Sequence, residues 1–130
     1  MTNIDTTAEN TDQIAALMHA NLFEVFNEAD DERRAEAIAR TYTPRVEWHD
    51  DGGVEIGRDA LREKAIALRG TLGGMEFAAA GPVHQTRGFG YLAWHLAPQG
   101  GEAVVSGFDV ALIKDGLIDA LYSVVLKTPN

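Results

Sequence analysis

The sequence predicts an α+β domain in which helices cover one face of a bent antiparallel sheet. Three observations support this prediction: helical periodicity in the first half, four long β-type segments in the second half, and turn signals between those segments. The chain has 130 residues, the size of one domain, with 45% hydrophobic and 24% charged residues, as in ordinary globular proteins. A domain of this length can bury a core and an internal pocket.

Two helices are expected before residue 43. In residues 8–29, apolar side chains recur at spacings of three and four, which is the period of one helix face, whereas residues 1–7 are polar and expected to be disordered. A second helix is predicted over residues 31–42, with Asp30 or Asp31 as its N-cap, because a short acidic side chain can accept from the free N–H groups there. Its predicted apolar side consists of Ala35, Ile38, Ala39 and Tyr42.

A hairpin and a third helix are expected next. Residues 45–49 are typical of a strand, residues 50–53 of a turn and residues 54–57 of a return strand. The third helix is predicted over residues 58–69, and Gly70, Gly73 and Gly74 are expected to stop it because glycine favours helix C-termini.

After residue 75 the chain is expected to be entirely β. The Asp115-Gly116 pair between apolar runs is a strong hairpin signal, since glycine tolerates the positive φ of a tight turn. The predicted strands are residues 75–86, 88–97, 102–113 and 117–127. Both faces of the third segment are largely apolar, so we expect one to lie under the helices and the other against a second subunit in a homodimer.

Charge and composition narrow the partners. There are 20 acidic and 11 basic residues, a net charge of −9, which argues against nucleic acid and membrane surfaces as partners. The absence of cysteine excludes disulfides and thiol catalysis, and the spacing of the four histidines does not predict a metal site. No apolar run approaches the roughly 20 residues of a membrane span and the N-terminus lacks the pattern of a signal peptide, so a cytoplasmic location is expected.

The clearest functional signal is Asp109, in the middle of the third β segment. Aspartate is a poor strand residue, and its carboxylate is costly to bury unless it is paired or protonated. One interpretation is a structural aspartate with a buried partner. The other is a carboxyl group of raised pKa that faces an apolar pocket and acts as an acid, a base or a hydrogen-bond donor.

A second candidate cluster lies in VEWHDDGG, residues 46–53, where Trp48, His49 and Asp50 are consecutive. Strand alternation sends successive side chains to opposite faces, so if Trp48 faces a pocket, Asp50 does as well and His49 points outward. A bulge at this strand end would reverse that order. Alternatively, the aspartates only satisfy the backbone of the turn.

Two segments carry a resemblance to a known superfamily: YTPRVEWHDDGGVEIGRDALREK, residues 42–64, and GFDVALIKDGLIDALYSV, residues 107–124. With the order of helices and strands around them, they resemble the nuclear transport factor 2-like superfamily, which includes ketosteroid isomerases and SnoaL-like polyketide cyclases. The resemblance implies a cone-shaped, cystatin-like fold over residues 8–130. In this fold three N-terminal helices and a curved, mainly antiparallel sheet enclose a pocket, and many members dimerise through the outer sheet face.

The ketosteroid isomerase pattern matches at one of three catalytic positions. The position of the general base falls on Trp48, that of the oxyanion tyrosine on about Leu22, and that of the protonated aspartate on Asp109. Tryptophan cannot abstract a proton and leucine cannot donate a hydrogen bond, so ketosteroid isomerase activity is not expected.

The SnoaL-like cyclases resemble this chain more closely, in length, in the VEWHD strand and in the strand that carries Trp94. That resemblance implies an isomerase, cyclase or lyase that needs no metal or cofactor and acts on a hydrophobic carbonyl compound. Asp109 would be its acid/base group, and His49 or Asp50 a secondary polar contact. The residues expected to line the pocket are Leu22, Trp48, Leu92, Trp94, Leu121 and Ser123. The alternative is a non-catalytic module of the same fold that binds a small ligand or acts through its sheet face.

Overall fold

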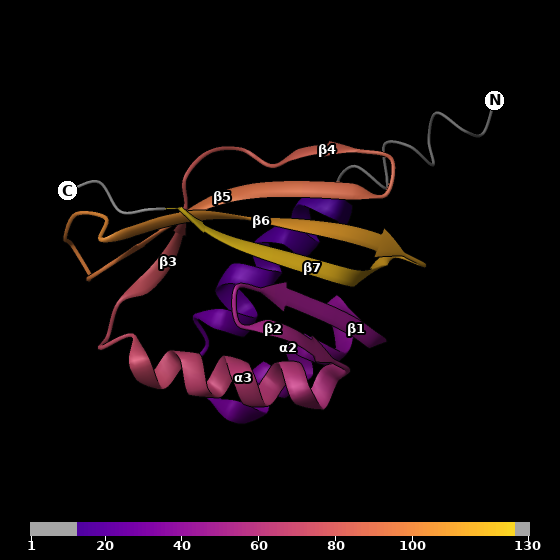
Figure 1. Ribbon diagram of the computed structural model, residues 1–130, viewed down its shortest axis with the longest axis horizontal. Coiled ribbons are helices and arrows are strands. Elements are labelled where there is room, and N and C mark those ends of the chain that lie inside the picture. Colours follow the sequence, from indigo (N-terminus) through magenta and orange to yellow (C-terminus); the bar gives the residue numbers. More distant parts are fainter. Residues whose placement is uncertain (1–12, 127–130) are drawn as a thin grey trace.

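The computed structural model describes residues 13–126, and in it α2 and α3 lie beneath a curved, open sheet (Figure 1). The α+β class and the curved sheet are as predicted from the sequence. The expected tail over residues 1–7 and the first turn of the helix predicted from residue 8 lie outside the described residues.

The first helix changes its geometry along its length. Residues 13–20 are α-helical, and the chain continues as a π-helical segment, η1, over Asn21–Phe26. The wider turn is visible in the backbone bond from Asn27 N to Leu22 O, 2.9 Å, which spans five residues. The buried face has the predicted periodicity and consists of Ile14, Leu17, Met18, Leu22, Val25 and Phe26. The helix ends at Phe26, earlier than predicted.

The helix α2, Asp31–Thr41, begins at the predicted N-cap, since the Asp30 carboxylate accepts from Arg33 N at 2.9 Å. The prediction of its buried face was wrong in part. The buried residues are Arg34, Ala37, Ile38 and Thr41, whereas Ala39 is exposed and Tyr42 begins the next strand. The reason is Arg34, whose guanidinium donates to the backbone carbonyls of Val25 and Glu28 and is thereby drawn into the interior.

The helix α3, Arg58–Thr71, continues past Gly70, so of the three glycines predicted to stop it Gly70 was wrong and Gly73 lies at the observed end. Gly70 is helical and exposed, and the chain leaves the helix only at Leu72 and Gly73. Gly73 has a φ of 62°, the left-handed conformation that commonly ends a helix. Leu61 and Ala65 form its buried face.

Seven strands form one sheet in the order β2-β1-β7-β6-β5-β3, with β4 also paired to β5. Their bounds are β1 Tyr42–Asp50, β2 Gly53–Ile56, β3 Glu76–Ala79, β4 His84–Thr86, β5 Phe89–Ala97, β6 Val105–Lys114 and β7 Leu117–Leu126. The pairing of β1 with β7 is parallel and the others are antiparallel. The segment predicted as one strand over 75–86 is divided into β3 and β4, because Gly81, with a φ of 149°, and Pro82 interrupt it.

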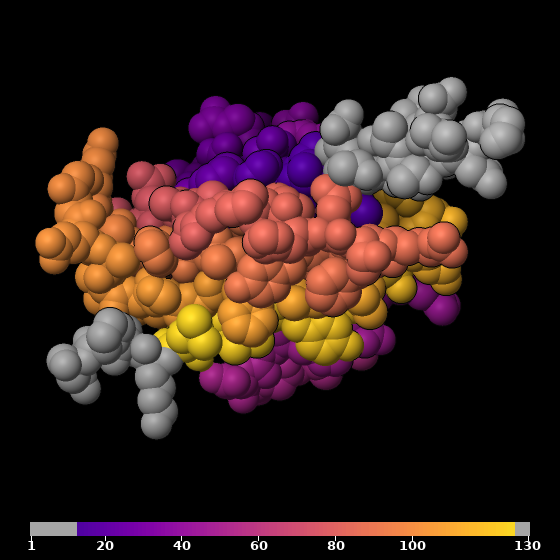
Figure 2. All heavy atoms as spheres, turned by 90° about the horizontal axis from the view of Figure 1, so that it is seen from above, coloured from indigo at the N-terminus to yellow at the C-terminus, as the bar shows by residue number. Residues whose placement is uncertain are grey.

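Alternation along β6 separates the two faces of the sheet. Gly107, Asp109 and Ala111 are buried toward the helices, whereas Phe108 and Leu112 lie on the opposite face. Figure 2 looks down onto that opposite face, where the orange and yellow side chains of the late strands form the surface. Within residues 13–126, no helix combines the length and the hydropathy that crossing a bilayer requires.

Candidate functional site

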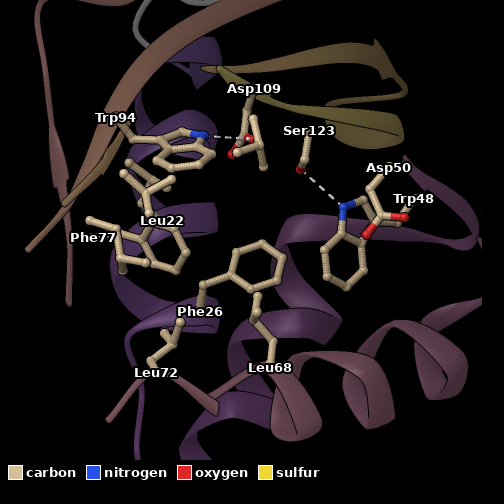
Figure 3. A pocket seen from close by; sticks show the side chains of 13 residues that line it. Leu22, Phe26, Trp48, Asp50, Leu68, Leu72, Phe77, Trp94, Asp109 and Ser123 are labelled. Atoms are coloured by element: carbon tan, nitrogen blue, oxygen red, sulfur yellow. Dashed lines mark hydrogen bonds between the residues drawn. The ribbon is translucent and has the colours of Figure 1, made fainter. Parts of the chain in front are cut away.

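A cavity of about 160 Å³ lies between the sheet and the helices, and Asp109 and Ser123 form its polar end (Figure 3). Its remaining wall is almost entirely apolar. The lining residues are Leu22, Phe26, Trp48, Asp50, Leu68, Leu72, Phe77, Trp94, Leu96, Val105, Asp109, Ser123 and Val125.

Asp109 is 3% exposed and accepts hydrogen bonds on both carboxylate oxygens. Trp94 Nε1 donates to Oδ1 at 3.0 Å, and Asn21 Nδ2 donates to Oδ2 at 2.8 Å. Burial raises the pKa of Asp109 to about 6, while the hydrogen bonds from Ser123 and the two N–H donors act in the opposite direction. Because N–H groups can only donate, the hydrogen bonds from Trp94 and Asn21 stabilise the ionised carboxylate and partly offset the effect of burial.

The positions of Trp94 and Ser123 beside Asp109 depend on further residues. Gly107 leaves room for the Trp94 ring, since a side-chain carbon at this position would overlap the indole. The Ser123 hydroxyl accepts from Trp48 Nε1 at 3.0 Å, so both tryptophans direct their N–H groups toward the polar end of the cavity.

An arc of aromatic rings runs around the cavity from Trp94, beside Asp109, through Phe77 and Phe26 to Trp48 (Figure 3). Phe26 lies 4.9 Å from Trp48 and 6.2 Å from Phe77 between ring centroids. Phe77 in turn meets Trp94 edge-on at 5.1 Å. A continuous wall of rings around one carboxylate suits a flat apolar ligand with a single polar group.

Asp50 lines the cavity beside Trp48 but is already paired. Its Oδ2 lies 2.7 Å from Lys64 Nζ, and its Oδ1 accepts from Gly52 N at 2.8 Å. The Lys64 ammonium also lies 4.8 Å from the centroid of the Trp48 ring. Asp50 therefore closes a turn and an ion pair at the edge of the cavity.

His49 points away from the cavity. Its ring stacks on Tyr122 at 4.4 Å, and its Nε2 lies 3.0 Å from Glu47 Oε1. The β1 strand keeps regular alternation over Trp48 and His49, each paired across to β2 and β7, so no bulge reverses these two side chains. The structure therefore does not bring His49 to Asp109.

Leu92 and Leu121, which we expected at the pocket, do not line this cavity. Both are fully buried and belong to the same core cluster as Met18 of the first helix. They belong to the packed core beside the cavity and not to its wall. Leu22, Trp48, Trp94 and Ser123 do line the cavity.

Asn21 and Tyr42 were not identified as site residues from the sequence, and both are fully buried. The Tyr42 hydroxyl donates to Asn21 Oδ1 at 2.5 Å, and the same amide donates to Asp109. A detectable signal existed for Asn21, since it is a polar residue three positions after Met18 on the apolar face of its helix. Among the described residues, no three His, Asp or Glu side chains converge as metal ligands would.

The sequence and the fold were compared with known proteins. A family model for the SnoaL-like domain matches residues 19–121. A SnoaL-like family protein of Agrobacterium tumefaciens, for which isomerase activity has been suggested, has a TM-score of 0.82, 23% identity, and coverage of 88% of this chain and 98% of that chain. No functionally curated protein matches the sequence at a significant level.

Two further solved structures have lower identity. A Kribbella flavida protein suggested to be a ketosteroid isomerase has a TM-score of 0.67 and 14% identity, covering 92% of this chain and 82% of that one. A Sinorhizobium meliloti protein suggested to be a polyketide cyclase has a TM-score of 0.55 and 19% identity, covering 72% of this chain and 81% of that one. At these identities the similarity shows a shared fold and no more. A further similar structure, of a Methylobium petroleophilum protein, has a cystatin-like fold. The chain thus belongs to the SnoaL-like domain family.

Proposed function

We propose that this protein is a cofactor-independent isomerase, cyclase or lyase that removes a proton beside the carbonyl group of a compact hydrophobic compound. The observation that carries the proposal is one buried carboxylate, Asp109, at the polar end of an aromatic cavity, held by N–H donors and not by a cation. Membership of the SnoaL-like family, with isomerase and cyclase activities suggested for neighbours of the same fold, supports this class of reaction.

Asp109 would act as a base and then as an acid. With a pKa of about 6, it is mostly ionised near neutral pH and still basic enough to take a proton from an activated carbon. The C–H bond breaks, its electron pair forms the enolate, and the proton passes to Asp109. Returning that proton to another carbon gives an isomer, whereas attack of the enolate carbon on a second carbonyl group gives a ring whose alkoxide takes the proton.

The size of the cavity indicates a small substrate. An apolar cavity of about 150 Å³ is known to hold benzene, so the volume of about 160 Å³ suits one ring with short substituents. A four-ring steroid is several times larger. The substrates that fit best are therefore one-ring enones or diketones.

Hydrogen–deuterium exchange tests this proposal without knowledge of the product. One-ring enones and diketones would be incubated with the protein in deuterated buffer, and exchange of the proton beside the carbonyl followed by NMR. We expect enzyme-dependent exchange that falls by about 10²–10⁴-fold in Asp109→Asn, the usual contribution of a positioned base. Equal exchange rates in the variant and the wild type would refute Asp109 as the base.

A second candidate function is the non-catalytic module of the same fold, which would act through its outer sheet face. This face presents exposed apolar side chains on β6 and β7: Leu112 at 42%, Tyr122 at 38%, Val124 at 36% and Leu126 at 47%. We infer that a second copy of the chain covers them in a homodimer. Sedimentation of the wild type and of Val124→Asp tests the homodimer. We expect a dimer for the wild type and a monomer for the variant. A monomeric wild type would contradict the dimer.

A further inference from the structure

We propose that Asn21 and Tyr42 are positioning residues, in which the Tyr42 hydroxyl fixes the Asn21 amide so that its N–H group, and not its carbonyl oxygen, faces Asp109. The inference deepens the proposed function and rests on it, because an ionised, oriented Asp109 serves a purpose only if it acts as a base. The geometry itself is independent of any reaction.

The three side chains form one hydrogen-bonded chain across three elements. Tyr42 is the first residue of β1, Asn21 opens η1, and Asp109 lies in β6. The Tyr42 hydroxyl lies 2.5 Å from Asn21 Oδ1, and Asn21 Nδ2 lies 2.8 Å from Asp109 Oδ2. Asn21 and Tyr42 are fully buried, so both depend on protein groups as hydrogen-bond partners.

The direction of the amide follows from the hydroxyl. A primary amide can rotate by half a turn, which would place its carbonyl oxygen against the Asp109 carboxylate. Rotation would also leave the Tyr42 hydrogen without an acceptor, because among residues 13–126 Asn21 Oδ1 is the acceptor that this hydroxyl has. Burial, followed by the negative charge of Asp109, raises the pKa of Tyr42 well above its ordinary value, so the hydroxyl remains a donor.

The backbone at Asn21 supports a specific role for this residue. Asparagine is a poor helix former, and its buried amide requires hydrogen-bond partners. The helix changes from α to π geometry at Asn21, and π turns are frequent at functional sites. A purely structural helix of this apolar character would be more stable with a regular α-helical turn and an apolar residue at this position.

Burial and neutral hydrogen-bond donors, Asn21 among them, control the ionisation of Asp109. None of the side chains that donate to Asp109 from η1, β5 and β7 is titratable. Tyr42 of β1 is the titratable group that interacts with it. The Asp50–Lys64 ion pair at the edge of the cavity carries no net charge.

Carbon-13 NMR of the Asp109 carboxyl group in the free protein tests the inference, with Asp109→Asn used to assign the resonance. In Tyr42→Phe either amide orientation leaves one group unpaired, so protonated Asp109 can donate to a rotated Asn21. We expect the midpoint of the titration to rise by roughly 0.5–1 pH unit. Asn21→Leu removes a donor to the charged form, and a rise of roughly 1–2 pH units is expected.

Thr43→Val is the matched control. Thr43 neighbours Tyr42 on β1 and donates to Asp119 Oδ1 at 2.7 Å, so this variant removes a hydrogen bond from the same strand without touching Asp109. Its titration should match the wild type. An unchanged or lowered midpoint in Tyr42→Phe overturns the inference, even if the variant is less stable, because a structural role lowers stability without moving this titration.

The remaining outcomes are also decisive. If Tyr42→Phe does not fold, Asn21→Leu decides: a raised midpoint supports the positioning role and an unchanged one overturns it. Because the measurement uses ligand-free protein, a failure to find any exchangeable substrate would count against the proposed function and leave this result intact.

Discussion

Two carboxylates line the same cavity, and their surroundings differ in one respect. Asp50 is held by the Lys64 ammonium at 2.7 Å and by a turn N–H group. Asp109 is almost fully buried, and among residues 13–126 its hydrogen-bond donors are neutral N–H and hydroxyl groups and include no cation. The pair shows that lining a cavity does not by itself make a carboxylate reactive.

The two carboxylates differ in the kind of group that stabilises their negative charge. A cation neutralises Asp50, so this side chain is committed to its ion pair and to the turn between β1 and β2. At Asp109, burial opposes the charge and neutral donors only partly compensate, so its pKa rises toward neutrality. A carboxylate in that state can exchange a proton with a ligand near neutral pH.

The largest effect should separate the two residues in activity. In the exchange assay, Asp109→Asn is expected to lose about 10²–10⁴-fold, whereas Asp50→Asn should stay within about tenfold of the wild type. The physical reason is that only Asp109 combines burial with freedom from a counter-ion. A comparable loss of exchange in both variants would contradict this difference and show that Asp50 and Asp109 both take part in the reaction.

The next effect concerns stability and pH. The folded-state pKa of Asp109 is raised from 3.8 to about 6, so the folded state binds more protons than the unfolded state between these values. Protonation of Asp109 therefore stabilises the folded state, and this contribution is fully present below about pH 4. It is lost as the pH rises through about 6, and the complete loss is about 3 kcal/mol.

Urea unfolding of the wild type and of Asp109→Asn across this pH range measures that loss. The difference in unfolding free energy between the two proteins should change by about 2 kcal/mol between pH 4 and 7, always to the disadvantage of the wild type as pH rises. A difference that is independent of pH would show that Asp109 titrates as an ordinary exposed aspartate.

The smallest effect lies on the Asp50 side. Lys64→Met keeps an unbranched side chain against Trp48 but removes the cation, and we expect a loss of about 1 kcal/mol or less in unfolding free energy. The exchange rate should remain within about tenfold of the wild type, as for Asp50→Asn. If Lys64→Met abolished exchange while retaining the fold, the ion pair would have to take part in substrate binding.

Local patterns in the sequence determined much of the framework. The apolar period of the first helix, the Asp30 cap and the Asp115-Gly116 hairpin are properties of neighbouring residues, and the structure confirms them. Both residues of that turn have positive φ, 53° and 80°, as a tight hairpin requires. The resemblance to the SnoaL-like cyclases implied that Trp48, Trp94 and Ser123 lie at the same pocket as Asp109.

What the tertiary structure alone decided is which of these residues meet. Asn21 lies 88 positions from Asp109, and no local period relates the two. The buried side of α2 depended on carbonyl groups outside this helix, to which Arg34 donates. Packing of the core likewise decided that Leu92 and Leu121 lie in it and not at the cavity. Periodicity records which side of an element is buried, but the contacts across the interior are set by how the elements pack.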